Sequence, residues 1–210
     1  MKSNAPCVLQ CSDSAGAKRM LIIDYIPPME ALLAEANEAD LRAVAPFTAE
    51  SRRRERLAWR VMLRRALGRE FEVEYLPSGK PQLRDAEFSH ISVSHCRDMV
   101  AVALSTRECG IDVELLERRF AAVAERYMSP EELSLAATAE EQAIVWSAKE
   151  VLYKMAGTEG LDWRREIRIV EINAAEQRVR GVVERRGERL VEQSLHYCYP
   201  DAEHIVLYGL

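Results

Sequence analysis

Two carboxylates, Asp112 and Glu114, stand two residues apart in the apolar segment 109–115 (CGIDVEL). In a strand, side chains two positions apart share a face, so both carboxylates project the same way while Ile111 and Val113 face the core. Neighbouring carboxylates on a largely apolar strand repel each other, and a hard divalent cation such as Mg²⁺ relieves that repulsion through their oxygens. The pattern predicts either a metal site or an edge strand with one solvated face.

A third carboxylate and a lysine lie in the segment 146–154 (WSAKEVLYK). On a helix Glu150 and Lys154 are four residues apart and share a face, with Trp146 one turn earlier. Such a pair supplies either a metal-binding carboxylate beside a phosphate-binding lysine or a surface ion pair. Spacing alone leaves both interpretations open.

Hydroxyl and imidazole groups meet in the segment 91–95 (ISVSH). Ser92 and Ser94 share a strand face, and His95 falls where the strand ends. This arrangement suits phosphate binding, although a lone histidine is more often a hydrogen-bonded structural residue. A dyad of His95 with Cys96 is not expected, because adjacent residues of an extended chain do not face each other.

An arginine-rich amphipathic helix is predicted from an N-cap at Thr48 to Leu67, closed by Gly68. Arginine binds phosphate through two parallel hydrogen bonds, so the helix indicates a phosphate or acidic-partner site, with a solvated helix face as the alternative. The arginines of this helix are Arg52, Arg53, Arg54, Arg56, Arg60, Arg64 and Arg65, and Arg69 follows directly after Gly68.

Strands and helices alternate around these groups. Strands are expected at 19–27, 71–76, 90–94, 99–105 and 109–115, with a turn at 77–81, and again from 167 onward. Helices are expected at 29–44, 48–67, after an N-cap at Ser129, and at 140–156 before Gly157. The pattern predicts an α+β fold of two similar lobes, an N-terminal lobe over 1–107 and a C-terminal lobe over 108–210.

Composition narrows the function classes. The chain has 210 residues, 48% of them hydrophobic and 30% charged, which is enough for a sizeable core. No run approaches the roughly 18 apolar residues of a membrane span, and a net charge of −5 argues against a nucleic-acid coat. The N-terminus lacks the apolar stretch of an export signal and the five cysteines form no C-x-x-C pair, so we expect free thiols in a reducing cytoplasm. Phosphate-binding loops of the P-loop and Rossmann kinds are absent from the sequence.

In chain order these motifs resemble those of the 4′-phosphopantetheinyl transferase superfamily, in its larger, two-lobed Sfp-type branch. The matching stretches all lie within 79–160: GKP (79–81), ISVSH (91–95), GIDVE (110–114), WSAKEVLYK (146–154) and the glycine loop 157–160. Cys96 departs from the pattern, because many members have a small hydroxyl residue after the histidine.

The resemblance implies two similar α+β lobes in one monomeric chain, with coenzyme A bound in the cleft between them. It implies that phosphopantetheine moves from coenzyme A to a serine hydroxyl of an acyl or peptidyl carrier protein of fatty-acid, polyketide or nonribosomal-peptide biosynthesis. Adenosine 3′,5′-bisphosphate leaves. Neither nucleic acid nor a membrane is expected as a partner.

The resemblance also implies roles for single residues. Asp112, Glu114 and Glu150 would bind Mg²⁺, and Glu150 and Lys154 would be the catalytic pair. The residues expected near coenzyme A are Lys80 and Ser94 at the nucleotide, His95 at the pyrophosphate, Lys149 nearby, and Arg52, Arg56 or Arg60 at the 3′-phosphate. A non-catalytic relative that binds coenzyme A or a carrier, and a plain acidic interaction domain, are the alternatives.

Overall fold

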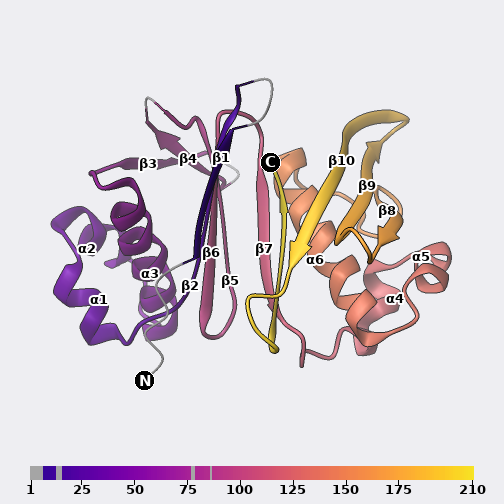
Figure 1. The fold of residues 1–210 in the computed structure, drawn as a ribbon, viewed down its shortest axis with the longest axis horizontal. Helices are drawn as coiled ribbons and strands as arrows, with labels where there is room; N and C mark the ends of the chain where they lie inside the picture. Colours follow the sequence, from indigo (N-terminus) through magenta and orange to yellow (C-terminus); the bar gives the residue numbers. More distant parts are fainter. Residues whose placement is uncertain (1–6, 13–15, 77–78, 86) are drawn as a thin grey trace.

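The computed structural model describes residues 7–12, 16–76, 79–85 and 87–210 (Figure 1). Pro77 and Ser78 of the predicted turn lie outside the described residues, as do the side chains of Cys7 and Cys11. In the part of the chain that is described, no helix is both long and apolar enough to cross a membrane.

The first half of the chain forms a four-stranded antiparallel sheet with three helices on one face (Figure 1). Its strands, in sheet order, are β1 (Cys7–Ser12), β2 (Lys18–Tyr25), β6 (Met99–Ser105) and β5 (His90–His95). Its helices are α1 (Met29–Glu35), α2 (Glu38–Val44) and α3 (Glu50–Leu67). A separate hairpin consists of β3 (Glu72–Tyr75) and β4 (Pro81–Arg84).

The second half forms a five-stranded antiparallel sheet. Its strands, in sheet order, are β7 (Gly110–Leu115), β11 (His204–Gly209), β10 (Glu188–Cys198), β9 (Arg178–Arg185) and β8 (Ile167–Asn173). Its helical segments are η1 (Phe120–Val123), α4 (Ala124–Tyr127), α5 (Pro130–Leu135) and α6 (Ala139–Ala156). Mixed helix and sheet in two regions confirms the α+β class.

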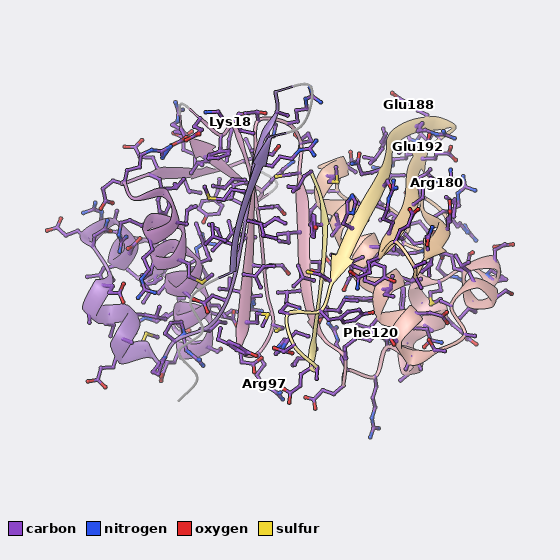
Figure 2. The ribbon with its side chains drawn as sticks, viewed as in Figure 1. Lys18, Arg97, Phe120, Arg180, Glu188 and Glu192 are labelled. Carbon is purple, nitrogen blue, oxygen red and sulfur yellow. The ribbon has the colours of Figure 1, made fainter. Side chains whose placement is uncertain are left out.

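The two halves meet where β5 and β7 run side by side, and side chains fill the space between the sheets (Figures 1 and 2). The hydroxyl of Ser92 on β5 accepts a hydrogen bond from the backbone N–H of Ile111 on β7, at 3.1 Å. Beside this contact lies an apolar layer that includes Leu21, Ile23, Ala101, Ala103, Ile111, Val113 and Val206. Because this layer covers β7, the strand is not a solvated edge.

Helix α6 packs directly on β7 and so sets the position of the 146–154 motif. Thr138 caps its N-terminus in a reciprocal capping box with Glu141, and Gly157 ends it in the left-handed region, as predicted for that glycine. A Cβ at Gly110 would lie 2.7 Å from the Val151 carbonyl oxygen, so only glycine permits this approach.

Two predicted helices were wrong in detail. The stretch 29–44 is two helices, because Ala36 is extended and Asn37 starts α2 in a capping box with Asp40. Helix α3 has Ala49 rather than Thr48 at its N-cap and no side-chain cap bond. The hairpin of β5 and β6, the cap at Ser129 and the strands from Ile167 are confirmed.

Candidate active site at the junction of the two halves

Asp112 is the most buried of the predicted site carboxylates, at 4% exposure. Its Oδ1 accepts hydrogen bonds from the Ser94 hydroxyl at 2.9 Å and from the Lys154 ammonium at 3.0 Å. Its Oδ2 is buried and has no hydrogen-bond partner. A buried carboxylate oxygen without a partner is costly, so this atom has a vacant acceptor position.

The other two carboxylates, Glu114 and Glu150, resist ionisation here. Burial raises the pKa of each, and the nearby charge of Asp112 raises both further. Glu114 Oε1 accepts a hydrogen bond from the Trp146 indole at 2.9 Å and forms an ion pair with Arg118. The predicted face of β7 and the predicted face of α6 therefore point at each other.

This donor set fits a hard divalent cation. The Asp112 Oδ2 atom is free to bind one, and a cation would relieve the repulsion that raises the pKa of Glu114 and Glu150. Two ion pairs neutralise part of the negative charge of these carboxylates. Lys154 pairs with Asp112, and Arg118 pairs with Glu114. A bound cation would compete with these two side chains for carboxylate oxygens.

The side-chain oxygens of Asp112, Glu114 and Glu150 do not all lie within 4.8 Å of one another. In the described ranges, the three-residue group whose ligand atoms all lie within 4.8 Å of one another consists of Cys96, Asp98 and His204 instead. The sequence motifs contain no signal for that second cluster, since His204 lies 106 residues from Asp98 in the chain.

A groove crosses the junction as three adjoining hollows of about 250, 300 and 480 Å³. The first is lined by Lys154 and the 157–159 loop together with Lys80 and Ser92. It shares Gly79, Pro81 and Val93 with the second, and the second shares Glu55 and His95 with the third. A long polar ligand can therefore run from the glycine loop past the arginine helix to Glu114.

The residues predicted at the nucleotide and pyrophosphate line this groove or its floor. Lys80 borders the first hollow and forms an ion pair with Glu108 at 2.6 Å. His95 lies between the second and third hollows, with Nε2 3.5 Å from Glu55 Oε2. Burial lowers the pKa of His95, and the positive charges of Arg52 and Lys154 act in the same direction. Ser94 is buried beneath, on Asp112.

Two of the three candidate arginines reach the groove. Arg52 and Arg56 both line the second hollow. The Arg56 guanidinium stacks over Tyr75 at 4.3 Å from the ring centre and over Phe47 at 5.4 Å, while Arg52 pairs with Glu55 at 3.1 Å. Phe47, just before α3, and Tyr75, on β3, were missed from the sequence, because neither belongs to a motif that predicts a phosphate site.

Arg60 does not reach the groove, which corrects its predicted role at a phosphate. Its side chain is 7% exposed, and its Nε lies 2.8 Å from Asp40 Oδ1. Arg64 pairs with the same carboxylate. These arginines of α3 therefore attach α2 to the helix rather than bind a ligand.

Lys149 is likewise structural, which corrects its predicted place near coenzyme A. Its ammonium is fully buried and donates to the carbonyls of Tyr127, Trp163 and Ile167 at 2.6 to 2.7 Å and to Glu132 at 2.6 Å. Lys149 therefore faces the core, whereas Glu150, the next residue, is partly exposed and lies near the charges of Asp112 and Lys154.

Comparison with known proteins agrees with these motifs over the second half of the chain. Residues 108–206 match the family model of the 4′-phosphopantetheinyl transferase superfamily. Over 93 residues the chain is 36% identical to the 4′-phosphopantetheinyl transferase psf-1 of Bacillus pumilus. That match covers 41% of this chain and 39% of the relative. The resemblance seen in the motifs is confirmed, and both matches support a transferase of this kind.

Proposed function

We propose that this protein transfers 4′-phosphopantetheine from coenzyme A to a serine of an apo acyl or peptidyl carrier protein. The observation that carries the proposal is Asp112, a buried carboxylate with one unpartnered oxygen, bonded to Lys154 beneath a groove that joins the two halves. A buried anion of this kind, beside a lysine that lines the groove, suits phosphoryl chemistry.

Asp112, Glu114 and Glu150 would hold Mg²⁺, which would supply positive charge to the pyrophosphate oxygens of coenzyme A. In the reaction, the serine oxygen forms a bond to the β-phosphorus, which carries pantetheine. The bond from that phosphorus to the bridging oxygen breaks, and adenosine 3′,5′-bisphosphate leaves.

The chain's own groups divide the work. Glu150 takes the serine proton, because a carboxylate at the rim of the metal site has a second oxygen with which to accept it. Lys154, which lines the first hollow, stabilises the negative charge that develops on the transferred phosphoryl group. His95 orients the pyrophosphate from the boundary of the second and third hollows.

The adenine nucleotide belongs in the second hollow. Arg52 and Arg56 line this hollow and bind the 3′-phosphate. Lys80 lines the adjoining first hollow and contacts the nucleotide from that side. Since Ser94 and His95 come from the first half and Asp112 from the second, we propose one monomeric chain with lobes 1–107 and 108–210 and a complete site. We place the activity in the cytoplasm, in keeping with the free thiols of Cys96 and Cys109.

Mass spectrometry tests the activity. Apo carrier proteins of the fatty-acid, polyketide and peptide classes are incubated with this protein, coenzyme A and Mg²⁺. We expect one carrier to gain the mass of a single phosphopantetheine. If coenzyme A raises the melting temperature of the protein but no carrier in the panel gains mass, the protein is the non-catalytic binding relative.

The 3′-phosphate assignment has its own test. We expect coenzyme A to raise the melting temperature more than dephospho-coenzyme A does, because ligand that binds the native state stabilises it by mass action. In Arg56→Met the two shifts should become nearly equal. The control is Arg65→Met, on the same helix but paired with Glu35 outside the groove. Equal shifts in the unaltered protein would remove the arginines from the 3′-phosphate site.

A further inference from the structure

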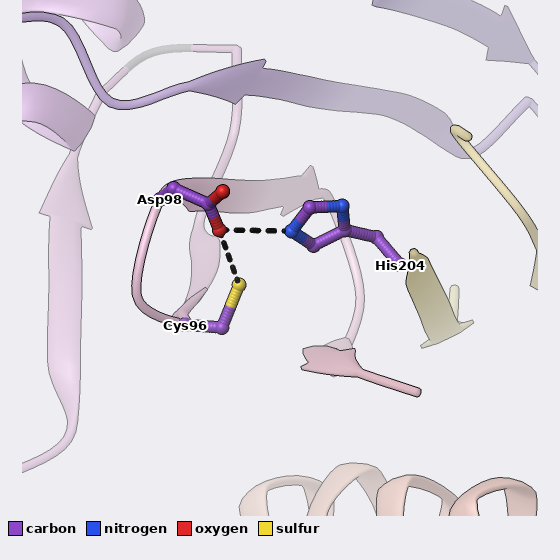
Figure 3. Close-up of side chains that lie close together, drawn as sticks. All are labelled: Cys96, Asp98 and His204. Atoms are coloured by element: carbon purple, nitrogen blue, oxygen red, sulfur yellow. Dashed lines mark hydrogen bonds and ion pairs between the residues drawn. The ribbon is translucent and has the colours of Figure 1, made fainter. Parts of the chain in front are cut away.

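A compact group of soft and hard ligands joins the two halves beside the groove (Figure 3). Cys96 and Asp98 lie in the turn between β5 and β6, and His204 begins β11. The Asp98 Oδ1 atom lies 2.9 Å from His204 Nε2 and 3.9 Å from Cys96 Sγ, so all three ligand atoms face one point. A thiol, a carboxylate and an imidazole are together the ligands that Zn²⁺ selects.

The Asp201 carboxylate fixes the imidazole of His204 through its Nδ1 atom. Its Nδ1 lies 2.9 Å from both oxygens of Asp201, which also accepts hydrogen bonds from the Tyr25 hydroxyl and from the backbone N–H groups of Glu203 and His204. A carboxylate behind a histidine fixes the ring and leaves Nε2 for the metal, which is the usual outer shell of a zinc site. His204 is fully buried, so its ring has no freedom to turn away.

The spacing is close to that of a tetrahedral site. Zinc bonds of about 2.0 Å to nitrogen and oxygen and about 2.3 Å to sulfur separate such ligands by about 3.3 Å (N to O) and about 3.5 Å (S to O). The two separations here, 2.9 and 3.9 Å, each differ from these values by about 0.4 Å. The third pair, Cys96 Sγ and His204 Nε2, also lies within 4.8 Å.

We propose that Cys96, Asp98 and His204 bind one Zn²⁺ or a similar divalent transition-metal ion that links the two halves of the chain. Binding releases the thiol proton of Cys96 and the Nε2 proton of His204. Cys96 also borders the third hollow, which supplies the entry path and room for a water as the fourth ligand. The site is separate from the Asp112 cluster and does not depend on the transferase proposal.

Cobalt provides the test, because Co²⁺ bound by a thiolate shows a charge-transfer band in the near ultraviolet. We expect one equivalent of Co²⁺ to produce the band, and Zn²⁺ to remove it and to raise the melting temperature reversibly with EDTA. Cys96→Ser should abolish the band and lower Zn²⁺ affinity by at least about tenfold. Cys109→Ser, which alters a buried thiol in the core between the sheets, should keep both.

Asp112→Asn separates this site from the carboxylate cluster and should keep the cobalt band. The proposal is overturned if Co²⁺ gives no thiolate band, or if the band persists in Cys96→Ser. The three residues would then form only a hydrogen-bonded contact between the halves, with His204 as an imidazolium between two carboxylates.

Discussion

Asp112→Asn is expected to lower phosphopantetheine transfer by about 100-fold or more while the protein stays folded. The amide keeps an oxygen to accept from Ser94 and Lys154, so the local hydrogen bonds survive. It replaces the unpartnered Oδ2 with an N–H donor, which repels a cation at the place where a ligand oxygen was vacant. Transfer to an apo carrier, followed by mass spectrometry over a range of Mg²⁺ concentrations, measures the loss.

Glu117→Gln is the matched control. Glu117 borders the third hollow and pairs with Arg97 at 2.9 Å, but its side chain is 66% exposed. Removing its charge should leave the transfer rate within about twofold of the unaltered protein, since exposed ion pairs contribute little. Near-normal transfer by a folded Asp112→Asn protein would show that the metal and catalytic assignment is wrong.

Lys149→Met is expected to lower the free energy of unfolding by about 3–5 kcal/mol. The methionine fills the volume of the side chain but leaves three backbone carbonyls, of Tyr127, Trp163 and Ile167, without their buried donor. It also leaves the Glu132 carboxylate in the core without its cation. Urea unfolding followed by circular dichroism measures the difference.

Arg42→Met is the control for charge removal alone. Arg42 is 72% exposed and pairs with Glu38 one turn away on α2, so its loss should cost under about 1 kcal/mol. If Lys149→Met does not fold, Glu132→Gln provides the measurement, because it keeps the size of the side chain, removes its charge and turns one of its two acceptor oxygens into a donor. A stable Lys149→Met protein with weakened coenzyme A binding would instead return Lys149 to the ligand site.

Local patterns in the sequence predicted the elements that carry the site. The hairpin of 90–105 follows from two short runs of strand-forming residues on either side of a turn, and the stop of α6 at Gly157 follows from a glycine in the left-handed region. Neighbouring residues alone determine both. The shared face of Asp112 and Glu114 follows from the period of a strand in the same way. The coenzyme A and Mg²⁺ roles assigned to these residues stay predictions.

Tertiary structure decided which charged residues face the groove. Lys149 and Arg60 have the residue types that bind phosphate, and both lie in stretches that predicted a ligand site. They are instead buried, because Lys149 pairs with Glu132 and Arg60 pairs with Asp40. Both partners lie on other helices, which the periodicity of one helix cannot predict. A charge with a buried partner is held in the core, and no local pattern identifies that partner.

The sequence by itself thus determined the α+β class and the faces of β7 and α6 that bear carboxylates, because both follow from the spacing of residues close together in the chain. Only the tertiary structure decided that these two faces meet, with Lys154 on Asp112 across 42 residues. It alone brought His204 to Asp98 across 106 residues. The physical reason is that such contacts depend on how the two sheets pack against each other, which is set by the whole core rather than by any one segment.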